Sequence, residues 1–267
     1  MFRNRERTLR DQKMMGVGDH ELFVEGCAPC VVALHGFGGT VAELRPLLDA
    51  VAGAGYAVDA ALLAGHGSRV EELQDLGFDA WVEGARSRLR VVREKHGRVV
   101  LLGFSLGSLV AMQLASEQPE GLAGLVVLGS ALTLHPLMSV PLGVWHRTGR
   151  RMPDVYLLKP LAGDLVDRTA MGSLVTYDRH PVRAALEVYL AGRRVRERVS
   201  RIECPTLVLH GRRDRVCPWK NAAWLAEHVG ARDVSVRLFE KSAHVLAWDG
   251  ERDDVAGEVL TFLARVA

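Results

Sequence analysis

A serine between two glycines interrupts an aliphatic segment of the chain. Residues 98–115 read RVVLLGFSLGSLVAMQLA, with Ser105 at the centre of a Gly-x-Ser-x-Gly pattern. The residues before Ser105 predict a buried strand, and those after it predict a helix from Leu106 to Gln118 that ends before Pro119. A serine at such a turn lies on a strained backbone, and flanking glycines let strand and helix approach closely. Taken alone, the motif fits a nucleophile elbow and a merely tight turn equally well.

A serine hydroxyl is a poor nucleophile at neutral pH, so this chemistry needs a base and an acid that orients the base. Asp214 follows the strand-like run TLVLHG, and His244 follows the next such run, VSVRLFE. The order Ser, Asp, His is the one expected when the three residues stand at strand ends of one parallel sheet. Asp249 is a rival acid, but it is too close in sequence to His244 for the two to come from separate strands.

Other histidines compete for the role of the base. His35, His66 and His210 also stand at expected strand ends, but each precedes a glycine and none follows the acid. The histidines that fall in expected helices or in the irregular middle of the chain are interpreted as surface or packing residues. His244 is therefore the preferred base.

A glycine-rich turn supplies the fourth part of this chemistry. The segment ALHGFGGT, residues 33–40, ends an expected strand with three glycines close together. Such a turn can direct backbone N–H groups at a negative charge that develops on a carbonyl oxygen. Phosphate binding is disfavoured, because no Gly-Lys-Ser/Thr follows the turn.

Strand-like and helix-like segments alternate along the chain, and they must position these residues. Strands are expected over residues 21–26, 30–36, 56–63, 98–104, 122–130, 204–211 and 233–240. Helices are expected over residues 41–55, 79–96, 106–118, 219–230 and 251–266. This alternation predicts an α/β fold, a mostly parallel central sheet with helices on both faces. Ligands of such sheets bind at the carboxyl ends of the strands, where the residues discussed above are expected.

Residues 131–200 break this rhythm. They are rich in Pro, Met, Trp and Arg and show no clear strand, so we expect a small inserted lid. The core then consists of residues 19–130 and 201–267, and residues 1–18 form a flexible N-terminal extension. The apolar residues of the insertion are interpreted as a pocket wall above Ser105, with packing of short helices onto the sheet as the alternative. These apolar residues are Leu132, Leu134, Leu137, Met138, Val140, Leu142, Val144 and Trp145.

Composition restricts the possible partners. The 267 residues are 25% charged with a formal net charge of +2, which favours neither nucleic acid nor an anionic membrane as a partner. No apolar stretch has the length of a signal peptide or of a membrane span, so a cytoplasmic location is expected.

Cys27 and Cys30 have zinc-knuckle spacing without a second ligand pair, and Cys30 is interpreted as a buried small hydrophobe. No metal is expected, and the oligomeric state is left open.

Taken together, these residues resemble the α/β-hydrolase superfamily, and within it the compact bacterial carboxylesterases and monoacylglycerol lipases. The similar stretches include VVALHGFGGT, LLAGHGSRVEELQDLGFDAW, VVLLGFSLGS, PTLVLHGRRDRVCP and SAHVLAWDGERDDV. The resemblance implies an α/β-hydrolase fold with Ser105 as nucleophile, His244 as base and Asp214 as orienting acid. It also implies that the backbone N–H groups of Phe37 and Leu106 form the oxyanion hole.

Two further details follow from the resemblance. The GHG sequence at residues 65–67 is similar to a family loop near the pocket and is interpreted as structural. Many relatives have glycine where Ser108 stands, which puts the packing of helix on strand in doubt but not the catalysis.

The resemblance implies a serine hydrolase that cleaves short- to medium-chain carboxylic esters, with monoacylglycerols among the candidates, through an acyl-enzyme and without a cofactor. The expected partner is a small-molecule ester substrate. Three alternatives stay open: a carbon–carbon bond hydrolase of the same fold, an acyltransferase of the same fold, and a non-hydrolytic ligand-binding protein.

Overall fold

The expected mostly parallel sheet is present in the computed structural model, which describes residues 21–158 and 164–267. The predicted N-terminal extension, residues 1–18, lies outside the described residues. The seven strands lie in the order β1 (Leu22–Val24), β3 (Tyr56–Ala60), β2 (Cys27–Leu34), β4 (Val99–Phe104), β5 (Leu122–Leu128), β8 (Thr206–Gly211) and β9 (Val234–Phe239). The edge strand β1 runs antiparallel to β3, and every other neighbouring pair is parallel. The carboxyl ends of β2, β4, β8 and β9 therefore meet at one edge.

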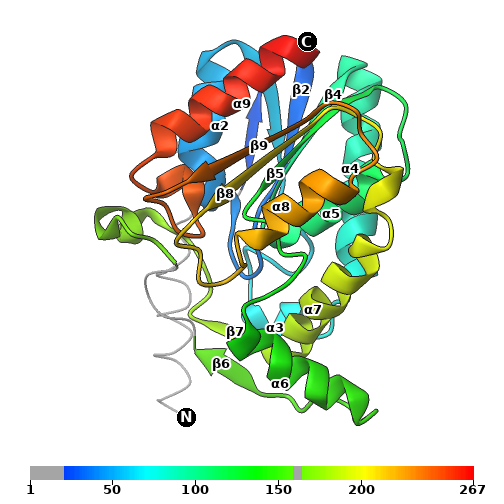
Figure 1. Ribbon diagram of the computed structural model, residues 1–267, viewed down its shortest axis with the longest axis vertical. Helices are drawn as coiled ribbons and strands as arrows, with labels where there is room; N and C mark the ends of the chain where they lie inside the picture. The colour runs from blue at the N-terminus through cyan, green and yellow to red at the C-terminus, as the bar shows by residue number, and fades with distance from the viewer. Residues whose placement is uncertain (1–20, 159–163) are drawn as a thin grey trace.

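Helices cover both faces of this sheet, as the sequence predicted (Figure 1). On one face lie α2 (Arg45–Gly53) and α9 (Arg252–Val266), and on the other lie α4 (Phe78–His96), α5 (Leu106–Ala115) and α8 (Lys220–His228). Strand β4 serves both layers, because its side chains alternate between the faces. Val99 and Leu101 pack with α4 and α5, whereas Val100 and Leu102 pack with α2 and α9.

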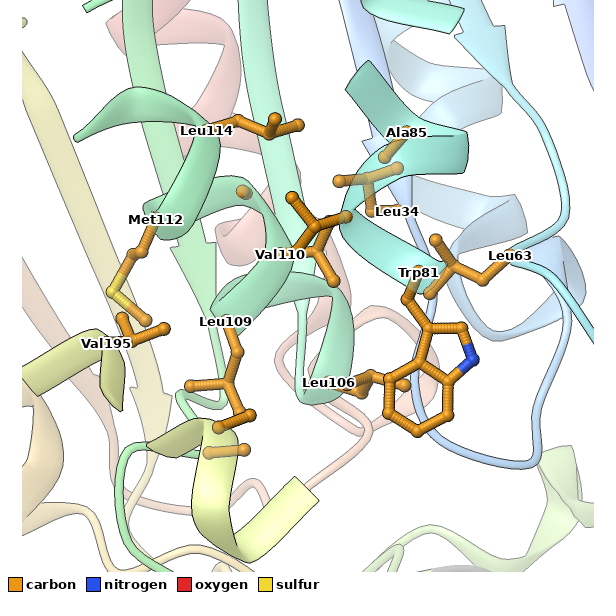
Figure 2. Packing of buried hydrophobic residues seen from close by; sticks show 14 of the residues in the cluster. Leu34, Leu63, Trp81, Ala85, Leu106, Leu109, Val110, Met112, Leu114 and Val195 are labelled. Atoms are coloured by element: carbon orange, nitrogen blue, oxygen red, sulfur yellow. The ribbon is translucent and has the colours of Figure 1, made fainter. Parts of the chain in front are cut away.

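Helix α5 is enclosed along its whole length, since all of its residues are buried. Figure 2 shows Leu106 and Val110 of α5 beside Trp81 of α4, with Leu34 of β2 close to Ala85. The buried side chains of α4 form the face that packs against α5, and they are Phe78, Trp81, Val82, Ala85, Leu89 and Val92. This packing fixes the position of the residue that begins α5, which bears on the site described below.

Two of the predicted helices differ from the expected ranges: one is divided in two, and the other ends early. The helix expected over residues 41–55 is a short 3-10 helix, η1 (Val41–Leu44), followed by α2 with a proline in its first turn. Pro46 has no N–H and is tolerated at a helix start, so the α-helix begins there. The helix expected to reach Gln118 ends at Ala115, and Gln118 has a positive φ of 51°. Two further short helices are α3 (Val70–Leu73) and η4 (Leu246–Trp248).

The segment between β5 and β8 contains a pair of strands that the sequence did not reveal. Its elements are α6 (Pro136–Arg147), β6 (Tyr156–Leu158), η2 (Arg168–Ser173), β7 (Arg179–Pro181), α7 (Val182–Arg196) and η3 (Val199–Arg201). Strands β6 and β7 pair antiparallel and are only three residues long, too short for a period-two pattern to show. Figure 1 shows α6, β6 and β7 gathered at one end of the molecule, away from α9.

Two cysteines lie on β2. Cys27 is exposed, whereas Cys30 is buried. Burial raises the pKa of the Cys30 thiol to about 12, so Cys30 packs as a small apolar side chain, as expected. Within the described part of the chain, no helix has both the length and the apolar character needed to cross a bilayer.

Candidate active site

Ser105 stands at an abrupt turn between β4 and α5, with φ of 53° and ψ of −115°. A positive φ is uncommon for a residue with a side chain and marks a strained backbone. A Cβ atom at Gly103 would lie 2.3 Å from the Gly107 carbonyl oxygen, and one at Gly107 would lie 2.1 Å from the Leu34 carbonyl oxygen. Both glycines are therefore required by the close approach of the chain segments. The turn has the geometry of an elbow that presents the serine at the strand end.

Ser108 fits into this turn without disturbing it. Its side chain is buried, its hydroxyl donates to the Ser105 carbonyl oxygen at 2.6 Å, and it accepts from the Ala131 N–H at 3.4 Å. The serine thus links the start of α5 to the segment after β5, and the doubt about helix packing is resolved.

The structure brings Ser105, His244 and Asp214 into one chain of hydrogen bonds. The Ser105 Oγ atom lies 3.0 Å from His244 Nε2, and His244 Nδ1 lies 2.7 Å from Asp214 Oδ2. The three residues follow β4, β9 and β8 and are each less than a tenth exposed. With Nδ1–H donated to the carboxylate, Nε2 is free to accept the serine proton.

The carboxylate of Asp214 is held by donors on both of its oxygens. Oδ1 accepts the N–H groups of Val216 and Cys217 at 2.8 and 2.7 Å, and Oδ2 also lies 3.0 Å from His210 Nε2. Burial by itself would raise the pKa of Asp214, but the charge and hydrogen bond of His244 and the bond from His210 outweigh it. The pKa of Asp214 therefore lies well below its ordinary range, and the group is ionised at neutral pH.

The imidazole of His244 experiences opposing influences. Burial lowers its pKa, but the charge of Asp214 and the hydrogen bond to it raise the pKa, and the charges of Asp164 and Glu43 add to the rise. The net pKa lies above its ordinary value of 6.5. A histidine with a raised pKa is a stronger base, which suits proton abstraction from a hydroxyl.

The predicted oxyanion donors, Phe37 and Leu106, lie on two segments that are joined directly. The Gly107 N–H donates to the His35 carbonyl oxygen at 3.1 Å, which ties the start of α5 to the loop after β2. Leu106 is the first residue of α5, where backbone N–H groups have no intrahelical acceptor. Across residues 21–158 and 164–267, no protein acceptor takes up the N–H of Phe37 or of Leu106.

Two buried histidines hold the loop after β2 against the loop after β3. His35 Nε2 accepts the Leu63 N–H, and His66 Nε2 accepts the Gly38 N–H, both at 3.0 Å. Their Nδ1 atoms lie near carbonyl oxygens of their own loops, so each ring is neutral in this arrangement. Burial, with His66 nearby, lowers the pKa of His35 to about 3. The structural role expected for the GHG sequence at residues 65–67 fits these contacts of His66, whereas no such role was predicted for His35.

The rival acid, Asp249, is fully buried and bonded to backbone groups. Its carboxylate accepts N–H groups of Ala243, Val166, Asp167 and Gly250 at 2.7 to 3.1 Å. These bonds fasten the loop that carries the candidate base to the segment between β5 and β8. Asp249 is thus an organising residue of that loop.

Two groups that touch the acid and the base were not predicted from the sequence. His210 was expected to matter only as a possible base, whereas its ring contacts Asp214. No role was predicted for Asp164, whose carbonyl oxygen accepts the His244 N–H at 3.0 Å. His210 carried a signal, since it stands four residues before the acid at a strand end. Asp164 lies in the irregular segment, and no sequence pattern distinguishes it.

The interpretation of the apolar residues of the insertion as one pocket wall is wrong in part. Leu132, Leu134 and Leu142 are buried in the core layer that contains α5. Trp145 of α6 is partly buried against the same layer, whereas Leu137, Met138, Val140 and Val144 are exposed, Leu137 by 82%. Leu132 and Leu134 also line a cavity of about 410 Å³, together with residues that include Tyr189, Arg193 and Arg196, but none of the candidate triad lines it.

Comparison with known proteins agrees with this architecture. The model of the family described as "Serine aminopeptidase, S33" matches residues 27–251. A thermostable monoacylglycerol lipase from Bacillus sp. (strain H-257) is 24% identical over 250 residues, covering 94% of this chain and 96% of the relative. A carboxylesterase from Bacillus subtilis (strain 168) is 25% identical over 245 residues, covering 91% of this chain and 95% of the relative.

A solved structure from work on LipS and LipT, two metagenome-derived lipolytic enzymes, has the same fold. It superposes with a TM-score of 0.83 at 24% identity, covering 93% of this chain and 98% of that chain. The order of the strands, the elbow at the end of β4 and the family match all indicate the same architecture. The chain belongs to the serine aminopeptidase S33 family and has the α/β-hydrolase fold.

Proposed function

We propose that this chain hydrolyses carboxylic esters, with Ser105 as the nucleophile, His244 as the general base and Asp214 as the acid that orients the base. The observation that carries the proposal is the continuous hydrogen-bond chain from Ser105 Oγ through His244 to Asp214, at 3.0 and 2.7 Å. The similarity to a monoacylglycerol lipase and a carboxylesterase supports hydrolysis of carboxylic esters.

In the first half of the reaction, His244 Nε2 takes the hydroxyl proton as Ser105 Oγ bonds to the ester carbonyl carbon. The carbonyl oxygen becomes an oxyanion and accepts the N–H groups of Phe37 and Leu106, which are fixed before the reaction begins. His244 then gives its proton to the leaving alcohol as the carbon–oxygen bond breaks. The acyl group is left on Ser105.

In the second half, water attacks the acyl-enzyme. His244 takes a proton from the water and returns it to Ser105 Oγ as the carboxylic acid leaves. Asp214 keeps Nδ1 protonated and stabilises the imidazolium form in both halves. Every proton moves among Ser105, His244, water and the alcohol. The ester and one water therefore give the alcohol and the carboxylic acid without a cofactor.

The substrate class is short- to medium-chain acyl esters, with monoacylglycerols as the natural candidates. The names of the relatives, monoacylglycerol lipase and carboxylesterase, support esters and monoacylglycerols as substrates, and the acyl-chain length is inferred from the border of the site. The half-buried Phe37 ring, whose N–H is a proposed oxyanion donor, packs near Trp81 and His180 and gives the site an apolar border. Each methylene buried from water contributes about 0.8 kcal/mol, so catalytic efficiency rises from acetyl esters toward medium chains.

The decisive experiment combines covalent labelling with turnover. A fluorophosphonate probe is expected to modify Ser105, identified by peptide mass spectrometry, and to abolish hydrolysis of p-nitrophenyl butyrate and monobutyrin. Ser105→Ala removes both labelling and turnover, by up to about 10⁶-fold, whereas Ser87→Ala on the exposed face of α4 leaves both unchanged.

Three results would overturn the proposal. Retention of more than roughly a tenth of the rate in Ser105→Ala excludes Ser105 as the nucleophile, because triad members act as a unit. Turnover of a vinylogous diketone but of no ester selects a carbon–carbon bond hydrolase. Saturable ligand binding without labelling or turnover selects a binding protein.

A further inference from the structure

The middle of the segment between β5 and β8 contacts the loops of the candidate active site at two separate places. We call residues 164–177 the strap. Its first end contacts the loops that carry Asp214 and His244, and its second end contacts the loop that carries Phe37. Chain segments distant in sequence are thereby connected across the candidate site.

The first anchor is Asp164. Its carbonyl oxygen accepts the N–H of His244 at 3.0 Å and that of Val245 at 3.3 Å. Its Oδ2 atom accepts the N–H of Arg215, the residue next to Asp214, at 2.6 Å. One residue therefore touches both the loop of the base and the loop of the acid.

The second anchor is formed by Thr176 and Tyr177. The Thr176 hydroxyl and the Tyr177 N–H both donate to the Gly38 carbonyl oxygen, at 2.9 and 2.8 Å. The Gly38 N–H is held by His66 Nε2, so Gly38 is fixed at both its N–H and its carbonyl group. Gly38 directly follows Phe37, whose N–H is a proposed oxyanion donor, and a shift of Gly38 would move that donor.

We infer that the strap sets the position of the base–acid pair relative to the oxyanion loop, with Asp164 and Thr176 as positioning residues. The inference rests on the ester hydrolysis proposed above. A misplacement of about 1 Å at a reacting group costs roughly 100-fold in rate, so bonds that fix these loops to one another affect the chemical step. A segment that only covered the substrate would instead affect binding.

The two anchors differ in charge, so their loss has different effects on the pKa of His244. His244 is faced by Asp214 from the β8 loop, by Asp164 from the strap and by Glu43 from η1. Asp164 in turn is faced by Asp214, His244 and Arg215. Removing the Asp164 charge lowers the pKa of His244, because one of the carboxylates that stabilise the imidazolium is gone. Thr176 is uncharged, so its loss leaves that pKa unchanged.

The test compares four variants of the full chain: Asp164→Ala, Thr176→Val, Thr176→Ser and Thr148→Val. Asp164→Ala removes both the charge and the oxygen that accepts the Arg215 N–H. Thr176→Val removes only the hydroxyl, and Thr176→Ser restores it. Thr148→Val is the matched control, since the Thr148 hydroxyl also donates to a carbonyl oxygen, that of Trp145, at the end of α6 and away from the strap.

Rates are measured with acetyl and octanoyl esters from pH 5 to 9, together with the rate of fluorophosphonate labelling and the thermal midpoint. We expect kcat to fall about tenfold in Asp164→Ala and Thr176→Val, equally for both esters, with KM changed less than about twofold. The pH midpoint moves toward acid only in Asp164→Ala. Thr176→Ser recovers most of the rate, and Thr148→Val matches the unaltered chain.

Normal kcat and labelling in folded Asp164→Ala and Thr176→Val would overturn the inference while leaving the proposed function intact. A change only in KM for the octanoyl ester would also overturn it, because the segment would then act on substrate binding. Failure of Thr176→Ser to recover the rate would rule out the hydroxyl bond as the cause. An unaltered chain that neither labels at Ser105 nor turns over esters would overturn the proposed function itself.

Discussion

His210 Nε2 lies 3.0 Å from Asp214 Oδ2, the same oxygen that lies 2.7 Å from Nδ1 of His244. The carboxylate thus stands between two buried rings, and its other oxygen is held by backbone N–H groups. The position of the charge that orients the candidate base is therefore fixed from several directions. Replacing that charge tests the arrangement most directly.

Asp214→Asn is expected to lower kcat for ester hydrolysis by about 10³- to 10⁴-fold while the chain remains folded. The amide removes the charge that stabilises the imidazolium, and it no longer selects the tautomer in which Nε2 is the acceptor. Steady-state kinetics of the purified variant, with circular dichroism to verify folding, checks this. A fall of less than about tenfold would mean that another acid orients His244.

Asp249→Asn is expected to affect stability far more than rate. An amide can accept on one oxygen only, so two of the four backbone N–H groups now bonded to Asp249 lose their acceptor. The free energy of unfolding should fall by about 2 to 4 kcal/mol, measured by urea titration, and kcat by less than about tenfold. A loss of kcat as large as that of Asp214→Asn would restore Asp249 as the orienting acid.

Activity and stability are expected to respond to pH in opposite directions because of His244. Its pKa in the folded chain is raised above 6.5, so its contribution to stability is complete below pH 6.5 and is lost as the pH rises through the folded value. The same rise makes the ring neutral and able to accept a proton, so kcat/KM increases over that window. His244→Gln should remove this part of the pH dependence of unfolding. A kinetic midpoint clearly below 6.5 would contradict the prediction.

His35 is expected to make the fold sensitive to acid. Its pKa is about 3 in the folded chain and about 6.5 when unfolded, so its stabilising contribution is complete above pH 6.5 and is lost as the pH falls toward 3. Over this range the unfolded state binds a proton that the folded state excludes, which costs at most about 1.4 kcal/mol per pH unit. Urea titrations between pH 7 and 4 should show a smaller slope in His35→Asn. Equal slopes would mean that the buried ring is protonated in the folded state.

Regular periodicity made the sheet and its helices predictable. Glycines at the elbow and the order of Ser105, Asp214 and His244 at strand ends were enough to bring the candidate triad together, because parallel strands present their carboxyl ends at one edge. The ends of helices were less predictable where a single residue interrupts the helix, as Pro46 does at the start of α2. Three-residue strands such as β6 leave no pattern to detect.

Contacts between segments that are distant along the chain could not be predicted from the sequence. Asp164 touches the base loop only because the chain returns to the sheet edge after β6, and no local residue pattern encodes that return. His35 and His66 illustrate an intermediate case. Their position before glycines argued against a role as the base, and the GHG sequence indicated a structural role for His66. Their bonds to the N–H groups of Leu63 and Gly38 depend on two loops that meet in space.

The final prediction separates the two sides of α6. Leu142 is 8% exposed and packs into the core, whereas Val140 is 59% exposed. Leu142→Ala should lower the free energy of unfolding by about 2 to 4 kcal/mol, because a buried side chain leaves a cavity when it is truncated. Val140→Ala should change it by no more than about 0.5 kcal/mol. Because Val140 faces solvent, the ratio of kcat/KM for octanoyl and acetyl esters should also be the same in Val140→Ala as in the unaltered chain. A selective loss of octanoyl turnover in Val140→Ala would show that this side of α6 contacts the acyl chain during catalysis, as a pocket wall would.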